Sequence, residues 1–430
     1  MGLLMMSVLC TLMVLVYLRP TDATTALCNL DSIPLFTETS RVCYPPVDDT
    51  SDLLYRHETD NSPWTESPYC TYSRSSGIIE KFCIYSSSIF NQNAGISIIA
   101  TPEAAASLAD AVRNPLPAWR NEDHLARRGQ LTSEQEANLP YKTVSMAGKG
   151  KGVIATRHIA QFDPIMVSFP AMVVDDEFFT REQRNQPVDS RGLFQRALLQ
   201  LEDQERFLSL ATTGRGHGVH IVEDIIRTNA FGLTVLGREM KGLYPEIARL
   251  NHGCDPNAFP QYKSRDMSMT AVATRDIQPG EEITISYLPM GLPTRHRLRS
   301  LENWGFNCSC TLCSSAPEVL EVSDRRRDRL AHVYRAIRQP TITYEDLVQL
   351  TGELLQLVHS ERLEPRFSEY FHLAAGLLFQ FRDYHRALEL TELSLKYSET
   401  FSDPEGAFCA GLRKDITFLK ELLRDDDLDK

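Results

Sequence analysis

The most constraining feature of the sequence is a cysteine-rich segment, WGFNCSCTLC, at residues 304–313. Its thiols follow the pattern C-x-C-x-x-C: Cys308, Cys310 and Cys313. Zinc in a structural site prefers four ligands, so this segment needs a fourth ligand from elsewhere in the chain. Cys254 is the candidate, because Cys409 lies in a segment of helical pattern and the remaining cysteines lie towards the N-terminus. Four cysteines with this spacing fit a metal better than disulfides, so the fold is expected to join two distant segments around zinc.

An apolar leader precedes the other cysteines. Residues 3–18 are nearly all apolar, and the small residues that follow them suit cleavage by signal peptidase. Residues 1–26 are therefore expected to be a signal peptide. A membrane anchor and a buried helix are the alternatives, although the apolar run is short for a membrane span, which needs ~20 residues. Behind a cleaved signal, the cysteines of the N-terminal region at residues 27–140 could form two disulfides: Cys28, Cys43, Cys70 and Cys83.

Composition narrows the classes of protein that this chain can be. Its 430 residues are 42% hydrophobic and 24% charged, which is ordinary for globular domains and excludes a collagen. The sequence has only one long apolar run, which excludes a multi-pass membrane protein. The net charge is -12, from 57 acidic and 45 basic side chains, so a basic footprint for nucleic acid is missing. No direct nucleic-acid partner is expected, whereas an acidic chain is compatible with a lysine-rich protein partner.

The pattern of apolar residues changes along the chain. Residues 27–100 show weak periodicity and predict short strands and loops, and β-rich runs follow from residue 141. Beyond Cys313 the pattern is helical, with apolar faces such as Leu330, Val333 and Ile337. Two helices expected near Phe367–Phe381 and Tyr384–Ser398 carry small residues and are similar to a tetratricopeptide hairpin. Residues 320–430 are therefore expected to form a helical domain that could bind peptide partners.

Three further motifs carry polar or glycine residues at close spacing. They are GKGKGVIA at residues 148–155, RLNHGCDPNAF at residues 249–259 and GEEITISY at residues 280–287. Each motif alone has an ordinary interpretation: a glycine-rich β-turn, a polar loop and a common strand. The glycine motif also lacks the strand–turn–helix context of a dinucleotide fold and the Walker spacing.

In this order, the three motifs and the cysteine segment resemble the SET-domain family of protein lysine methyltransferases, over residues 142–315. The segment GLYPEIARLNHGCDPN and the helical C-terminal region resemble the branch of MYND-type SET proteins, although a MYND finger is missing. With its leader, the chain is also similar to fungal SET proteins that have a predicted signal peptide. The resemblance implies an α+β fold: a β-rich SET fold with a pseudo-knot and a post-SET zinc loop at residues 141–315, followed by an all-α, helical-repeat-like domain.

The resemblance implies an S-adenosylmethionine-dependent protein lysine N-methyltransferase, with in-line methyl transfer in a narrow lysine channel. Tyr287 would be the catalytic tyrosine. The implied contacts to S-adenosylmethionine are Lys149, Gly150, Lys151, Asn229, Asn251, His252 and Phe306. The implied ligands of a structural zinc ion are Cys254, Cys308, Cys310 and Cys313. The implied partner is a lysine-bearing protein, with histones among the candidates.

Two other functions remain as alternatives. One is a non-catalytic SET-fold protein that uses its helical C-terminal domain for interactions. The other is a methyltransferase that acts on a non-histone or small-molecule amine. Localisation has two interpretations as well, because the leader indicates the secretory pathway or the endoplasmic reticulum, whereas zinc thiolates and S-adenosylmethionine fit the cytoplasm or nucleus.

Overall fold

The computed structural model describes residues 63–75, 78–113, 138–183, 190–210, 212, 220–235, 237–302 and 304–428. The predicted leader at residues 1–26 and two of the candidate disulfide cysteines, Cys28 and Cys43, lie outside these residues. Within the described part of the chain, no helix is both long enough and apolar enough to cross a bilayer.

The largest sheet has the strand order β1-β2-β3-β7-β9-β8. Its strands are Tyr69–Ser75, Ile78–Ser87, Ile96–Ala100, Met172–Asp175, Arg238–Leu243 and Phe231–Val235 in that order. β3 and β7 run parallel, with Ser97 opposite Met172, and every other pair in this sheet is antiparallel. Strands from residues 69–100 and from residues 172–243 therefore share one sheet.

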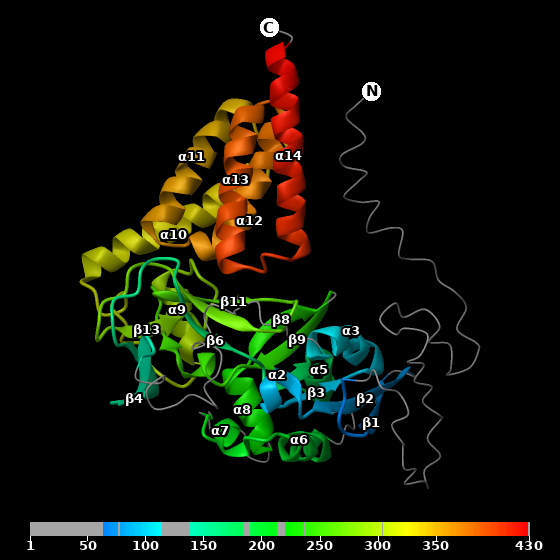
Figure 1. Ribbon diagram of the computed structural model, residues 1–430. Helices are drawn as coiled ribbons and strands as arrows, with labels where there is room; N and C mark the ends of the chain where they lie inside the picture. The colour runs from blue at the N-terminus through cyan, green and yellow to red at the C-terminus, as the bar shows by residue number, and fades with distance from the viewer. Residues whose placement is uncertain are drawn as a thin grey trace. The chain divides into compact units, whose positions relative to one another are not determined.

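Both faces of this sheet are covered, so its strands alternate between two apolar cores. Phe82 and Ile84 of β2 face an aromatic core with helices α5 (Asp176–Gln183), α6 (Ser190–Leu199), α7 (Gln204–Leu208) and α8 (Ile221–Asn229). Cys83 and Tyr85 of the same strand face the other core, which α3 (Pro102–Arg113) helps to form. Side chains that alternate with period two explain this division. Figure 1 shows the helices on the two sides of the strands.

A disulfide joins the first two strands. Cys70 and Cys83 are opposite each other in the β1–β2 register, and their Cα atoms lie 4.0 Å apart. One of the cysteine pairs that the sequence offered is therefore bonded.

Two smaller sheets hold the sequence motifs. The first has the order β10-β13-β5-β4 and contains Asn251–His252, Glu282–Ile285, Gly150–Ala155 and Tyr141–Met146. The second has the order β11-β12-β6 and contains Ala258–Tyr262, Met269–Ala273 and Pro164–Ser168. β10 and β13 pair in parallel, although long segments separate them in the chain.

Among the residues that the structure describes, six helices follow the sheets: α9 (Thr294–Glu302), α10 (Pro317–Ile337), α11 (Tyr344–Ser360), α12 (Glu364–Gln380), α13 (Tyr384–Phe401) and α14 (Ala407–Leu428). Helices α11 to α14 lie side by side (Figure 1) around an apolar core of their own. Small buried residues allow α12 and α13 to approach closely, and Ser394 Oγ donates to the carbonyl of Ser368 at 2.7 Å. The β-rich sheets and these helices confirm the predicted α+β class.

Several contacts join the helices to the sheets. Gln261 of β11 donates its amide to the carbonyl of Glu399 at 2.8 Å, and the Phe259 and Phe401 rings lie 5.8 Å apart. Among the helices themselves, the backbone amide of Thr294 at the start of α9 donates to Asp324 of α10 at 2.7 Å. A boundary between the sheets and a separate domain at residues 320–430 stays a prediction.

Candidate active site and metal centre

The four-stranded sheet brings the three motifs onto neighbouring strands. The glycine motif forms the β4–β5 turn, where Gly148 and Gly150 have φ values of +72° and +71°. These positive φ angles are easily reached only by glycine, which explains both residues. β5 pairs with β13, which carries GEEITISY, and β13 pairs with Asn251–His252 of the NHGC motif. The candidate site is therefore built from three segments that are distant in sequence.

Glu282 links two of these segments. Its Oε2 lies 2.8 Å from Lys149 Nζ in the glycine turn, and its Oε1 accepts a hydrogen bond from Asn251 Nδ2 at 3.0 Å. Both oxygens of the carboxylate are thus engaged by residues that the resemblance assigns to the cofactor.

The third glycine of the motif, Gly152, has a different role from the first two. A Cβ atom at Gly152 would lie 2.2 Å from Met146 Sδ and 2.6 Å from Asn251 Nδ2. The space beside this residue is therefore filled by the side chains of Met146 and Asn251, which only glycine permits.

Gly152→Ala is expected to lower the free energy of unfolding by about 1–3 kcal/mol, since an added methyl must displace Met146 and Asn251. Chemical denaturation of the full chain measures this change. Gly352→Ala is the control, because Gly352 lies in α11 with nothing within 4 Å of its added Cβ. The control is expected to be neutral or more stable by about 0.5–1 kcal/mol, and equal destabilisation by both variants would contradict the prediction.

Tyr287 follows β13 and lies in an aromatic cluster. Its hydroxyl donates to the carbonyl of Leu250 at 2.8 Å, and its backbone amide donates to His252 Nδ1 at 3.0 Å. The Tyr287 ring centre lies 4.9 Å from Trp304 and 6.4 Å from Phe306. Burial, together with the negative charge of Glu282, raises the pKa of Tyr287 to about 12. The phenol is therefore neutral at physiological pH.

His252 connects Tyr287 to the cysteines. Since Nδ1 accepts from the Tyr287 backbone, the neutral ring must carry its proton on Nε2, which lies 3.2 Å from Cys254 Sγ. Burial lowers the pKa of His252 to about 4, so the ring is neutral. A neutral imidazole thus donates towards a cysteine sulfur and fixes the backbone of Tyr287 at the same time.

The cysteine cluster fits a tetrahedral metal centre. The sulfur atoms of the cluster all lie within 4.8 Å of one another: Cys254, Cys308, Cys310 and Cys313. Cys254 Sγ lies 3.9 Å from Cys308 Sγ and 3.5 Å from Cys313 Sγ. A Zn–S bond of ~2.3 Å places the sulfurs of a tetrahedron about 3.8 Å apart, which agrees with these distances. The cluster can therefore hold a metal ion, and its residues come from the two segments that the sequence suggested.

The other predicted cofactor residues differ in their positions. Phe306 is 36% exposed, and its ring centre lies 6.1 Å from that of His252. Lys151 is exposed on β5, beside the turn. Asn229 ends α8 and is not on this sheet; its amide donates to the carbonyl of Ile225 in its own helix at 2.7 Å. The structure thus brings Lys149, Gly150, Asn251, His252, Tyr287 and Phe306 into one region.

Sequence reasoning missed two residues of this region, Glu282 and Trp304. Glu282 is the second acid of GEEITISY, and its two contacts depend on strand pairing that no local pattern reveals. Trp304 begins the cysteine segment, and its ring lies closer to that of Tyr287 than the rings of His252 and Phe306 do. An aromatic residue two positions before Phe306 was the available signal for Trp304.

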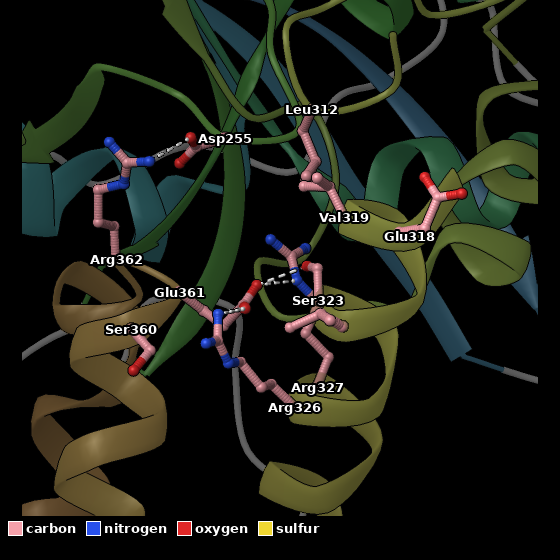
Figure 2. Close-up of a pocket in the computed structure, with 11 residues that line it drawn as sticks. Asp255, Leu312, Glu318, Val319, Ser323, Arg326, Arg327, Ser360, Glu361 and Arg362 are labelled. Atoms are coloured by element: carbon pink, nitrogen blue, oxygen red, sulfur yellow. Dashed lines mark hydrogen bonds and ion pairs between the residues drawn. The ribbon is translucent and has the colours of Figure 1, made fainter. Parts of the chain in front are cut away.

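A pocket of about 400 Å³ lies between the cysteine segment, α10 and the α11–α12 turn. Figure 2 shows Arg327 and Ser323 directed at Glu361, at distances of 2.9 and 2.6 Å. Arg362 forms an ion pair with Asp255 at 3.1 Å. Asp255 directly follows Cys254 in the chain. The pocket is lined by residues other than the predicted catalytic, cofactor and zinc residues.

Known proteins share part of this region of the chain. The SET domain family matches residues 150–288. The N-lysine methyltransferase SMYD2-A of Danio rerio is 25% identical over 201 residues, 43% of this chain and 46% of that protein. The histone-lysine N-methyltransferase SMYD3 of Homo sapiens is 39% identical over 87 residues, 19% of this chain and 20% of that protein. The histone-lysine N-methyltransferase set5 of Schizosaccharomyces pombe is 34% identical over 103 residues, 24% of this chain and 32% of that protein.

The chain spans less than half the length of each of these relatives. The family match begins at Gly150 of the glycine turn, includes Asn251 and His252, and ends one residue after Tyr287. The matched residues therefore include the strands that form the candidate site. Residues 150–288 thus match the SET domain family, and the relatives that share part of this chain are named N-lysine or histone-lysine methyltransferases.

Proposed function

We propose that this protein is an S-adenosylmethionine-dependent protein lysine N-methyltransferase. The observation that carries the proposal is the position of Tyr287, beside His252 and Trp304 and near the strands that hold Lys149 and Asn251. In this proposal Lys149, Gly150, Lys151, Asn251 and His252 contact the cofactor, and Phe306 packs against its adenine. Asn229 would have to reach the cofactor from the end of α8, outside this sheet.

The residues present suit such a cofactor chemically. Lys149 offers a cation, Asn251 offers an amide, and Phe306 offers a partly exposed aromatic ring. When bound, S-adenosylmethionine supplies an electrophilic methyl group on a positively charged sulfur. The chain's own contribution is to align a lysine amine with that methyl group. Proximity and orientation account for much of the rate enhancement of a reaction between two bound groups.

Tyr287 is the residue best placed to orient the amine. Its hydroxyl proton is directed at the Leu250 carbonyl, so the oxygen lone pairs remain to accept from an amine N–H. The incoming lysine must first lose its proton, and a nearby positive charge lowers the pKa of an amine. The neighbouring rings of Trp304 and Phe306 would exclude water from this position.

The methyl-transfer rate is expected to rise with pH from about 7 to about 10 without a decline. A free lysine has a pKa of ~10.4, so its reactive neutral fraction grows over this range. The pKa of Tyr287 is raised to about 12, so the phenol keeps its proton where an ordinary tyrosine ionises. Initial rates at saturating cofactor measure the profile, and circular dichroism checks the fold at each pH. A decline that starts near pH 9 in folded protein would exclude a neutral Tyr287 as the orienting group.

Zinc is proposed as the ion of the cysteine cluster, with a structural role. Cys308, Cys310 and Cys313 follow Trp304 and Phe306 directly, so a metal bound there would fix both rings beside Tyr287. Cys254 would join this segment to His252.

The proposed substrate is a lysine-bearing protein, with histones among the candidates. The relatives named as histone-lysine methyltransferases support this class. The test is transfer of a labelled methyl group from S-adenosylmethionine to a protein or peptide library, followed by mass spectrometry of the labelled lysine. Binding of the cofactor without transfer to any substrate would contradict an enzyme and favour the alternative of a non-catalytic interaction protein. Transfer to free amines alone would favour the alternative of a non-protein substrate.

The helical domain is proposed to be tetratricopeptide-like and to contact the same substrate protein. The pocket in Figure 2 supports this, because the cysteine segment and α10 both line it. Val319 and Val322 on α10 are 52% and 36% exposed there, next to the positively charged Arg326.

Replacing both valines by serine in the full chain is expected to raise the KM for the protein substrate and leave cofactor affinity unchanged.

A further inference from the structure

The contacts of Glu282 determine how the side chain of Asn251 is turned. An ionised carboxylate only accepts hydrogen bonds, so the atom of Asn251 that faces Glu282 must be the NH₂ group. The second contact of that nitrogen is Met146 Sδ at 3.6 Å, which is also an acceptor. The amide oxygen of Asn251 is therefore directed away from both, and no donor from the described residues reaches it.

The same carboxylate holds Lys149. Its Oε2 lies 2.8 Å from Lys149 Nζ, and the Glu282 side chain is only 18% exposed. One carboxylate on β13 thus fixes a cation on the glycine turn and an amide on β10. Each of the three residues comes from a different strand or turn, so the arrangement exists only in the folded protein.

We propose that Glu282 is a positioning residue, which turns the Asn251 oxygen and the Lys149 ammonium towards the amino-acid end of S-adenosylmethionine. This inference rests on the proposed function. The amino-acid end carries an ammonium and a carboxylate. The Asn251 oxygen accepts from the ammonium, and Lys149 pairs with the carboxylate. Glu282 contributes to binding through these two residues and takes no part in the methyl transfer.

Glu282→Gln replaces the carboxylate by an amide of the same size, so the negative charge and one of the two acceptor oxygens are lost. A glutamine can donate to the Asn251 oxygen, so the Asn251 amide is free to turn around, and the ion pair with Lys149 is lost. The affinity for S-adenosylmethionine is expected to fall about tenfold or more, because each lost hydrogen bond to a charged group usually reduces affinity by at least about this factor. The affinity for 5′-methylthioadenosine, which lacks the amino-acid end, is expected to stay within about twofold of wild type, since that ligand does not reach these residues.

Isothermal titration calorimetry with both ligands tests the inference on the full chain. The matched control is Glu281→Gln, because the neighbouring Glu281 bonds Arg275 and Asn257 instead of the two cofactor residues. Equal losses for both ligands in Glu282→Gln would indicate a general structural effect and overturn the inference, as would wild-type affinity for S-adenosylmethionine. If the wild-type chain binds no S-adenosylmethionine, the proposed function fails and the inference fails with it.

Discussion

Tyr287→Phe is expected to reduce the rate of methyl transfer by about 100-fold or more, at saturating S-adenosylmethionine. The substitution keeps the ring that packs beside Trp304 and removes only the hydroxyl that would orient the lysine amine. Because the hydroxyl is assigned to the amine, the affinity for S-adenosylmethionine is expected to change by less than about threefold. The measurement combines single-turnover transfer of a labelled methyl group with calorimetric titration of the cofactor.

Tyr244→Phe provides the matched control for this experiment. Tyr244 is also buried, and its hydroxyl donates to a backbone carbonyl, that of Met267, at 2.9 Å. The two variants therefore lose the same kind of hydrogen bond, worth about 0.5–1.5 kcal/mol of stability. Tyr244→Phe is expected to keep its transfer rate within about twofold of wild type, since the Tyr244 ring neighbours Phe231 and its hydroxyl bonds Met267, neither of which is a predicted site residue.

Two results would argue against the role of Tyr287. Equal loss of activity in Tyr287→Phe and Tyr244→Phe would attribute the effect to stability. Full activity in Tyr287→Phe would show that another group orients the amine, and Trp304, whose ring lies 4.9 Å away, would be the next residue to replace.

Motifs with specific chemistry allowed much of the site to be predicted from the sequence. Four thiols with this spacing suit few structures other than a metal centre, and Cys254 was found by excluding the other cysteines. The structure places its sulfur 3.5 Å from that of Cys313. The resemblance to the SET-domain family assigned Asn251 and Tyr287 to one site. In the structure β10 pairs with β13, and the backbone amide of Tyr287 donates to His252 Nδ1.

The large sheet was harder to predict because its central strands are buried on both faces. All five residues of β3, Ile96–Ala100, are buried, so the alternation of apolar and polar residues that marks a half-buried strand is missing. The pairing of β3 with β7 joins segments on either side of residues 114–137, and no local signal specifies such a partner. The role of Glu282 was hidden for the same reason, since its partners come from two other segments.

Cys313→Ser is expected to abolish stoichiometric zinc binding and most of the methyl-transfer activity. Three thiolates no longer complete the site, and a structural zinc ion contributes a large share of the folding free energy of a small metal-bound segment. The apolar cluster around the cysteines is small: Cys254, Leu288 and Leu301 are buried, and the side chains packed against them, such as Leu292, Trp304 and Leu312, are only partly buried. The main cores contain many more buried side chains and do not depend on the metal.

The expected consequence is a local loss of order around Trp304 and Phe306 within an otherwise folded protein. Tyr287 would then lose its two aromatic neighbours and the link from His252 to a metal-bound Cys254. Metal analysis, circular dichroism and the transfer assay measure these three effects together. Cys409→Ala is the control, because Cys409 is buried in α14 and lies outside the cluster. Wild-type activity in metal-free Cys313→Ser protein, or disulfides among the four cysteines of the native chain, would contradict a structural zinc centre that holds the active site closed.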